Sequence, residues 1–93
     1  MKAYKHLVKA VLDDGNTVSV WDGEEWQVKR GTKYQAIINA IESVEEAQLR
    51  IRLGSDDQRV IGWALVIPFG LEDDETIADC TCNAYMDAIL ADI

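Results

Sequence analysis

His6 is the only histidine in the chain and the first side chain to weigh for chemistry. Imidazole titrates near neutral pH, so a histidine often serves as the general acid or base of an active site. The sequence contains no nucleophile elbow, no phosphate-binding loop and no dinucleotide motif to accompany it. We therefore expect His6 to be a partly buried structural residue, and we predict that the protein is not an enzyme and uses no cofactor. An enzyme that uses His6 or a pair of carboxylates remains an alternative, because such a pair is defined by a distance that a sequence does not give.

Cys80 and Cys82 are the only cysteines, and one residue separates them. A zinc site needs four ligands, usually with two to four residues between paired cysteines. A disulfide between residues this close is rare, because the bond requires particular Cα and Cβ distances. The acidic runs lack the spacing of a calcium-binding loop. We expect two free thiols and no metal site.

Trp21 and Trp26 flank the turn-forming segment Asp22-Gly23, which predicts a β-hairpin. Side chains alternate between the two faces of a strand, so a two-residue or a four-residue loop places both tryptophans on one face. A three-residue loop would separate them. The pair could be a partly exposed binding anchor. The alternative, which we favour, is a cross-strand pair that stiffens the hairpin or packs under a helix.

The charge of the chain is strongly acidic and unevenly distributed. Seventeen acids and nine bases give a net charge of −8. Residues 1–59 contain nine bases and ten acids, whereas residues 60–93 contain seven acids and no base. Phosphate binding depends on Lys and Arg, so neither nucleic acid nor an anionic membrane is an expected partner.

A basic protein surface is the expected partner, although a net charge can also serve only solubility. The predicted acidic binding face consists of Glu72, Asp73, Asp74, Glu75, Asp79, Asp87 and Asp92.

Three strands are predicted in the first third of the chain. Residues 4–12 alternate loosely between apolar and polar positions, which indicates a half-buried strand. Thr17–Trp21 and residues 26–29 are rich in β-forming side chains on either side of the turn. Together these segments predict a three-stranded meander.

A helix and two further strands are predicted next. Residues 33–43 repeat their apolar positions at helical spacing, and Thr32 and Gln35 have the spacing of a capping box. Residues 49–53 alternate with a period of two. Residues 60–67 are almost entirely apolar, which favours a central strand covered on both faces.

The last helix has two alternative starts. The acids near Asp74 suit a helix N-terminus, whereas Asn83 could cap a shorter helix, which we prefer slightly because residues 80–82 are poor helix formers. The predicted order is β-β-β-α-β-β-α. We expect a single α+β domain over residues 1–93, with a largely antiparallel sheet of about five strands and two helices packed on one face.

Two segments, VWDGEEW at residues 20–26 and GWALVIPFG at residues 62–70, resemble small uncharacterised acidic proteins encoded by tailed bacteriophages. The resemblance carries over no catalytic residue. It implies that the protein is a host-takeover or anti-defence factor. Some such factors mimic the charge of DNA to block basic enzymes. The chain also lacks the apolar run of a signal peptide or a membrane span, so we expect a soluble cytoplasmic protein, in the host cytoplasm if it is encoded by a phage.

The leading hypothesis is thus a non-enzymatic binding protein whose acidic C-terminal third docks on a basic surface of a host protein. A structural or assembly protein that acts as a homo-oligomer is the second hypothesis. Electrostatic docking predicts association that slows with salt, whereas assembly predicts a stable self-complex.

Overall fold

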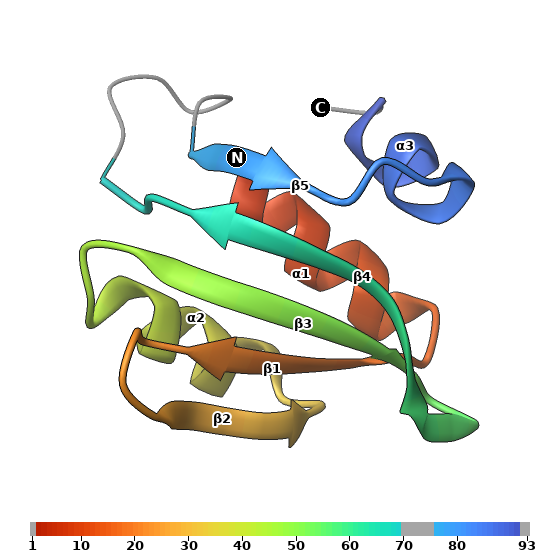
Figure 1. The fold of residues 1–93 in the computed structure, drawn as a ribbon, viewed down its shortest axis with the longest axis horizontal. Helices are drawn as coiled ribbons and strands as arrows, with labels where there is room; N and C mark the ends of the chain where they lie inside the picture. Colours follow the sequence, from red (N-terminus) through yellow and green to blue (C-terminus); the bar gives the residue numbers. More distant parts are fainter. Residues whose placement is uncertain (1, 70–75, 92–93) are drawn as a thin grey trace.

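The computed structural model describes residues 2–69 and 76–91 of the chain (Figure 1). Its described part is an α+β domain with one five-stranded sheet in the order β2-β1-β3-β4-β5, in which all neighbouring strands are antiparallel. The α+β class and the antiparallel sheet are confirmed, but the predicted element order is wrong. The elements are α1 (Ala3–Asp13), β1 (Thr17–Trp21), β2 (Trp26–Gly31), α2 (Tyr34–Glu42), β3 (Ala47–Leu53), β4 (Asp56–Val66), β5 (Ile77–Cys80) and α3 (Ala84–Leu90).

The first element is a helix, α1, and the predicted strand over residues 4–12 is wrong. The buried residues of α1 recur at helical spacing and form one stripe: Ala3, Tyr4, Leu7, Val8 and Val11. Such a stripe is what packs a helix against a core. The loose alternation was compatible with both periods, because residues 4 and 8 fall on one side of a strand and also on one side of a helix.

The C-terminal part contains a strand that the sequence did not predict. β5 pairs with β4, with Cys80 opposite Ala64 and Asp79 opposite Leu65. The chain leaves this strand and enters α3 at Asn83, whose side-chain oxygen accepts the backbone N–H of Met86 at 2.9 Å. The preferred shorter helix is confirmed, and a helix that starts near Asp74 is excluded by β5. The capping box at α2 is wrong, since the cap residue there is Lys33 and no side chain caps the helix.

The Asn83→Ala variant is expected to lower the free energy of unfolding by about 1.5 kcal/mol, since it removes a helix cap and a hydrogen bond. The side-chain nitrogen of Asn83 also donates to the Ile61 carbonyl at 2.9 Å. The Asn83→Ser variant keeps a capping oxygen but lacks the donor to Ile61, so it should recover about half of the loss. Urea denaturation measures both values. Equal stability of Asn83→Ala and the wild type would contradict the role of the cap.

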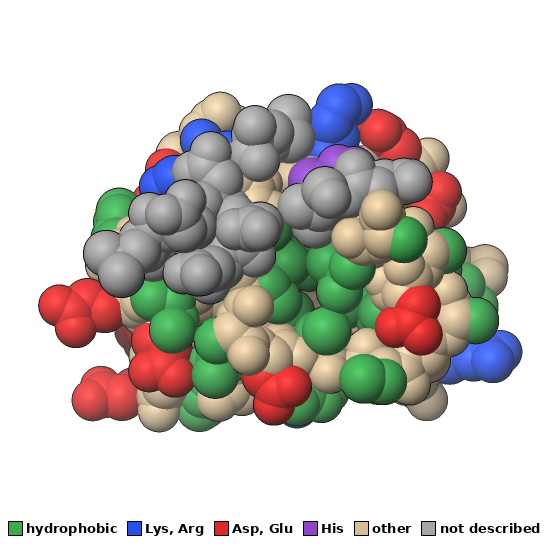
Figure 2. Space-filling view, turned by 90° about the horizontal axis from the view of Figure 1, so that it is seen from above, with side chains coloured by type: hydrophobic (Ala, Val, Ile, Leu, Met, Phe, Trp, Pro, Cys, Tyr) green, Lys and Arg blue, Asp and Glu red, His purple; other side chains and the backbone are tan. Residues whose placement is uncertain are grey.

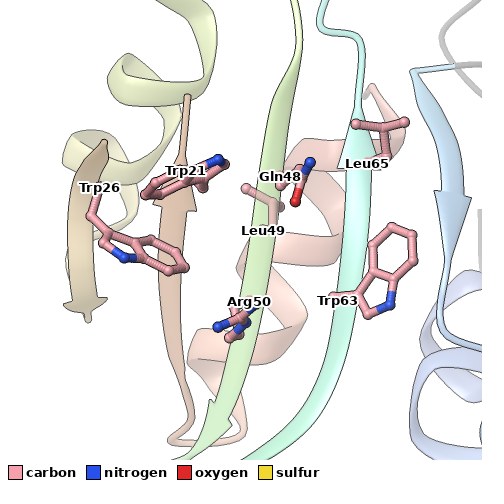
Figure 3. A pocket seen from close by; sticks show the side chains of 7 residues that line it. All are labelled: Trp21, Trp26, Gln48, Leu49, Arg50, Trp63 and Leu65. Carbon is pink, nitrogen blue, oxygen red and sulfur yellow. The ribbon is translucent and has the colours of Figure 1, made fainter. Parts of the chain in front are cut away.

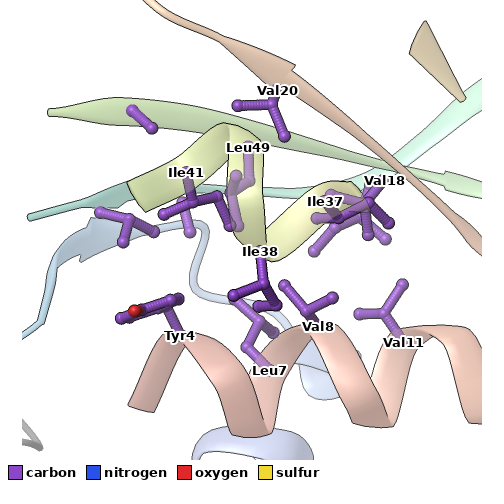
Figure 4. Packing of buried hydrophobic residues seen from close by; sticks show 14 of the residues in the cluster. Tyr4, Leu7, Val8, Val11, Val18, Val20, Ile37, Ile38, Ile41 and Leu49 are labelled. Atoms are coloured by element: carbon purple, nitrogen blue, oxygen red, sulfur yellow. The ribbon is translucent and has the colours of Figure 1, made fainter. Parts of the chain in front are cut away.

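The three described helices cover one face of the sheet (Figures 1 and 4), so packing on a single side is confirmed, but the predicted number of two helices is wrong. On this face Val20, Leu49 and Ala64 lie side by side on β1, β3 and β4, and all are buried. The core between sheet and helices consists mainly of Tyr4, Leu7, Val8, Val11, Val18, Val20, Ile37, Ile38, Ile41, Leu49, Ile51, Val66 and Met86. Burial of this apolar surface is the main force that holds the layers together.

The third helix joins the same layer through Met86, which is fully buried. A Cβ atom on Gly62 of β4 would lie 2.7 Å from the Met86 sulfur, so the glycine provides the room for this side chain. β4 was predicted to be covered on both faces, and this is wrong. Trp63 is 41% exposed and Val60 is 48% exposed, because no described helix packs on the other face of the sheet. None of the described helices has the length and apolar composition of a membrane-spanning helix.

Candidate functional site

The candidate site lies on the face of the sheet that carries no described helix, which we call the open face. Residues that pair across strands, or lie two apart along a strand, share one face. Across the sheet, Trp26 pairs with Trp21, Trp21 with Gln48, and Gln48 with Leu65. In the next row, Arg50 pairs with Trp63. All three tryptophans of the chain therefore lie on the open face.

These two rows surround a hollow of about 480 Å³, which we call the tryptophan hollow (Figure 3). Its two sides come from different strands. Trp21 and Trp26 form one side, Trp63 and Leu65 form the other, and β3 runs between them with Gln48 and Arg50. The lining residues are Trp21, Trp26, Gln48, Leu49, Arg50, Trp63 and Leu65. The volume falls in the range of ligand and anchor pockets.

The tryptophan pair of the hairpin forms one side of the hollow and is only half buried. The ring centroids of Trp21 and Trp26 lie 5.1 Å apart at an interplanar angle of 66°, which is an edge-to-face contact. The prediction that both share one face is confirmed, and the register is that of the four-residue loop. The pair is a cross-strand contact of the hairpin that leaves part of its ring surface exposed, and its role as a binding anchor stays a prediction.

The hairpin loop is held in shape by Asp22. Its carboxylate accepts the backbone N–H groups of Glu24 and Glu25, both at 2.8 Å, and the amide of Gln27 at 2.6 Å. These hydrogen bonds, first of all the one from Glu25, lower the pKa of the Asp22 carboxyl below its usual value. Gly23 has a φ of 105°, which a glycine adopts without strain. The loop therefore holds Trp21 and Trp26 in a fixed relation.

The centre of the hollow is polar. The Arg50 guanidinium lies 5.3 Å from the centroid of the Trp26 ring, a cation–π contact. Within the described residues, Arg50 forms no ion pair and Gln48 forms no side-chain hydrogen bond. Trp63 is fixed by its backbone, which exchanges hydrogen bonds with Thr81 at 2.9 and 3.0 Å. The hollow thus combines aromatic sides with unused hydrogen-bond donors.

Five acidic residues lie in the two loops at one end of the sheet, next to the hollow. The hairpin loop follows Trp21, and the second loop precedes Ala47, so the pairing of Trp21 with Gln48 brings both loops to the same end. We call these residues the acidic end: Asp22, Glu24, Glu25, Glu45 and Glu46. Neither loop contains a basic residue. The acidic end is not predicted by the sequence, because its two loops are about 20 residues apart in the chain and only strand pairing makes them neighbours.

The predicted acidic face of the C-terminal third lies only partly within the described residues. Asp79 on β5 and Asp87 on α3 are both exposed. The other predicted members, Glu72, Asp73, Asp74, Glu75 and Asp92, lie outside the described residues. Figure 2, which views the molecule from above, shows the described acidic side chains as separate groups with hydrophobic and polar atoms between them.

His6 lies between two helices and away from the tryptophan hollow. Its ring nitrogen Nε2 is 3.2 Å from the carbonyl oxygen of Ile89 in α3. The side chain is partly buried, as expected, although on a helix and not on a strand. Within the described residues, no carboxylate or hydroxyl lies at hydrogen-bond distance from His6.

The two cysteines are free thiols. Cys80 is half buried and Cys82 is exposed. Burial, followed by the nearby Cys82, Asp79 and Asp87, raises the pKa of the Cys80 thiol and makes it less reactive. No group of three potential metal ligands occurs in the part of the chain that the structure describes.

Comparison with known proteins gives no relative for this chain. No family model, no curated protein and no solved structure matches it.

Proposed function

We propose that this protein is a non-enzymatic binding protein that docks its open face on a partner protein with a basic surface. The observation that carries the proposal is the tryptophan hollow, with three tryptophans and Arg50, beside the acidic end. Trp and Arg are the residue types that most often dominate the binding energy of protein interfaces. A host-interaction or anti-defence role, as the resemblance to phage proteins implies, is part of the proposal.

The aromatic side chains of this surface are expected to determine affinity, and the charged side chains to determine the association rate. Partly exposed rings, such as that of Trp63, bury apolar area on docking and supply affinity. Exposed acids at the margin contribute little affinity, but they attract a basic surface and accelerate the encounter. Asp79, opposite Leu65 on β5, extends the negative charge to the far side of the hollow. The acids at residues 72–75 and Asp92 lie outside the described residues, so their contribution to docking is predicted from the sequence alone.

Neutralising part of the acidic end is expected to slow association with the partner about threefold at low ionic strength, because it weakens electrostatic steering. The variant is Glu45→Gln/Glu46→Gln, and its dissociation rate should stay near that of the wild type. The partner is first captured on the immobilised protein from a lysate of host cells. It is then purified, and its association rate is measured at several salt concentrations.

The matched control is Gln35→Lys/Asn39→Lys, which changes the net charge by the same +2 on exposed positions of α2. It should slow association much less, since α2 covers one face of the sheet (Figure 1) and the hollow lies on the other. Equal effects of both variants, or an association rate that does not change with salt, would contradict docking through the acidic end. A stable self-complex in light scattering, with no other partner, would favour the homo-oligomer instead.

A further inference from the structure

We infer that the tryptophan hollow receives an acidic side chain of the partner, next to an aromatic side chain that packs between the two aromatic sides. This inference rests on the proposed docking function and specifies the anchor that the partner presents. It is derived from the spacing of the sides, from the unused donors on β3 and from the charge pattern of the open face.

The spacing of the hollow suits one aromatic side chain. Trp21 lies on β1 and Trp63 on β4, with β3 between them, so their backbones are about 10 Å apart at the usual strand spacing. A planar ring needs about 3.5 Å on each side for van der Waals contact. With a volume of about 480 Å³, the hollow has room for one such ring beside Gln48 and Arg50, in contact with the tryptophans that line it.

The side-chain hydrogen-bond donors on β3 require an acceptor when a partner covers them. Arg50 and Gln48 point into the hollow and form no ion pair or side-chain hydrogen bond within the described residues (Figure 3). A guanidinium matches a carboxylate with two parallel hydrogen bonds. Burial of these donors under a docked partner would be costly unless the partner supplies acceptors. A carboxylate meets that requirement better than a neutral group.

A cation of the partner is a poorer occupant of the same place. The Arg50 guanidinium already covers the Trp26 ring at 5.3 Å, so a lysine or arginine inserted here would meet a like charge. Nucleic acid is also disfavoured, because its further phosphates would approach Asp22, Glu24 and Glu25 at the acidic end. The open face is thus basic at its centre and acidic at one end. A complementary partner is acidic at its anchor and basic around it.

The test uses three blocked tetrapeptides of the form acetyl-Gly-X-Phe-Gly-amide, in which X is Glu, Gln or Lys. Binding is followed by the NMR signals of the three indole N–H groups. The Glu peptide is expected to bind about tenfold more tightly than the Gln peptide, as for a charge-assisted pair, and the Lys peptide more weakly than both. The Arg50→Gln variant should remove this preference. Arg59→Gln, an exposed change of the same charge outside the hollow, should retain it.

Three results would overturn the inference: preference for the Lys peptide, absence of binding by all peptides, or equal effects of Arg50→Gln and Arg59→Gln. Displacement of the Glu peptide by a short oligothymidylate would assign the hollow to single-stranded nucleic acid instead. The proposed function is tested separately, by the association rates of the acidic-end variant. If that variant slows association but the peptides show no preference for Glu, the docking proposal stands and the inference about the anchor fails.

Discussion

The Trp63→Ala variant is expected to bind the purified partner at least about 30-fold more weakly, which corresponds to about 2 kcal/mol. Trp63 forms one side of the tryptophan hollow, and 41% of its surface is exposed in the free protein. Docking would bury this ring, and truncation would remove one of the two aromatic sides. The dissociation rate should carry most of the effect, because the ring contributes contact and no charge. Surface plasmon resonance with the purified partner measures both rates.

Val60→Ala is the matched control for this prediction. Val60 lies on the same strand and is 48% exposed, but it does not line the hollow. Its truncation should change the affinity less than about threefold, which is typical of positions outside a hot spot. Both variants should unfold at nearly the same urea concentration as the wild type. Unchanged affinity of Trp63→Ala would show that the partner does not use the tryptophan hollow.

Elements with an unambiguous period could be predicted from the sequence. β3 alternates strictly, with Leu49 and Ile51 on the buried face and Arg50 on the open face. The hairpin could be predicted because Asp22-Gly23 is a strong turn signal. The common face of Trp21 and Trp26 could be predicted from the alternation of side chains, because a two-residue and a four-residue loop both place the two tryptophans on one face.

The errors arise where local signals are ambiguous. In α1, Tyr4 and Val8 satisfy both the strand period and the helix period, and only packing against α2 and β1 decides between them. β5 is only four residues long, and its position depends on pairing with β4. Such pairing is a long-range interaction that a local pattern does not contain.

The tryptophan hollow could be predicted only in part, because its exposure depends on the arrangement of the helices. An apolar run such as residues 60–67 fits a strand buried on both faces. The three described helices all lie on one side, so Trp63 and Leu65 remain on the open face. The alternation of β3 places Arg50 on its exposed face, but nothing in the local sequence indicates that Trp26 and Trp63 flank it. Residues of four strands, β2, β1, β3 and β4, form this site, and only the order of the strands in the sheet brings them together.

The Leu49→Ala variant is expected to lower the free energy of unfolding by about 3 kcal/mol, since it removes a buried side chain and leaves a cavity. Leu49 is 1% exposed and lies on the central strand, between Val20 and Ala64 on the face that the helices cover. A domain of this size has only about 5–15 kcal/mol of stability in total, so the loss is a large share. Urea denaturation followed by circular dichroism measures it.

Gln48→Ala is the control for Leu49→Ala, because Gln48 is the preceding residue on the same strand and its side chain points to the open face. Its truncation should change stability by less than about 0.5 kcal/mol, as for other exposed positions. The contrast between neighbours tests which face of the sheet is the core. If Gln48→Ala were the costly change and Leu49→Ala the neutral one, the two faces would be exchanged. The tryptophans would then belong to the core and could not bind a partner.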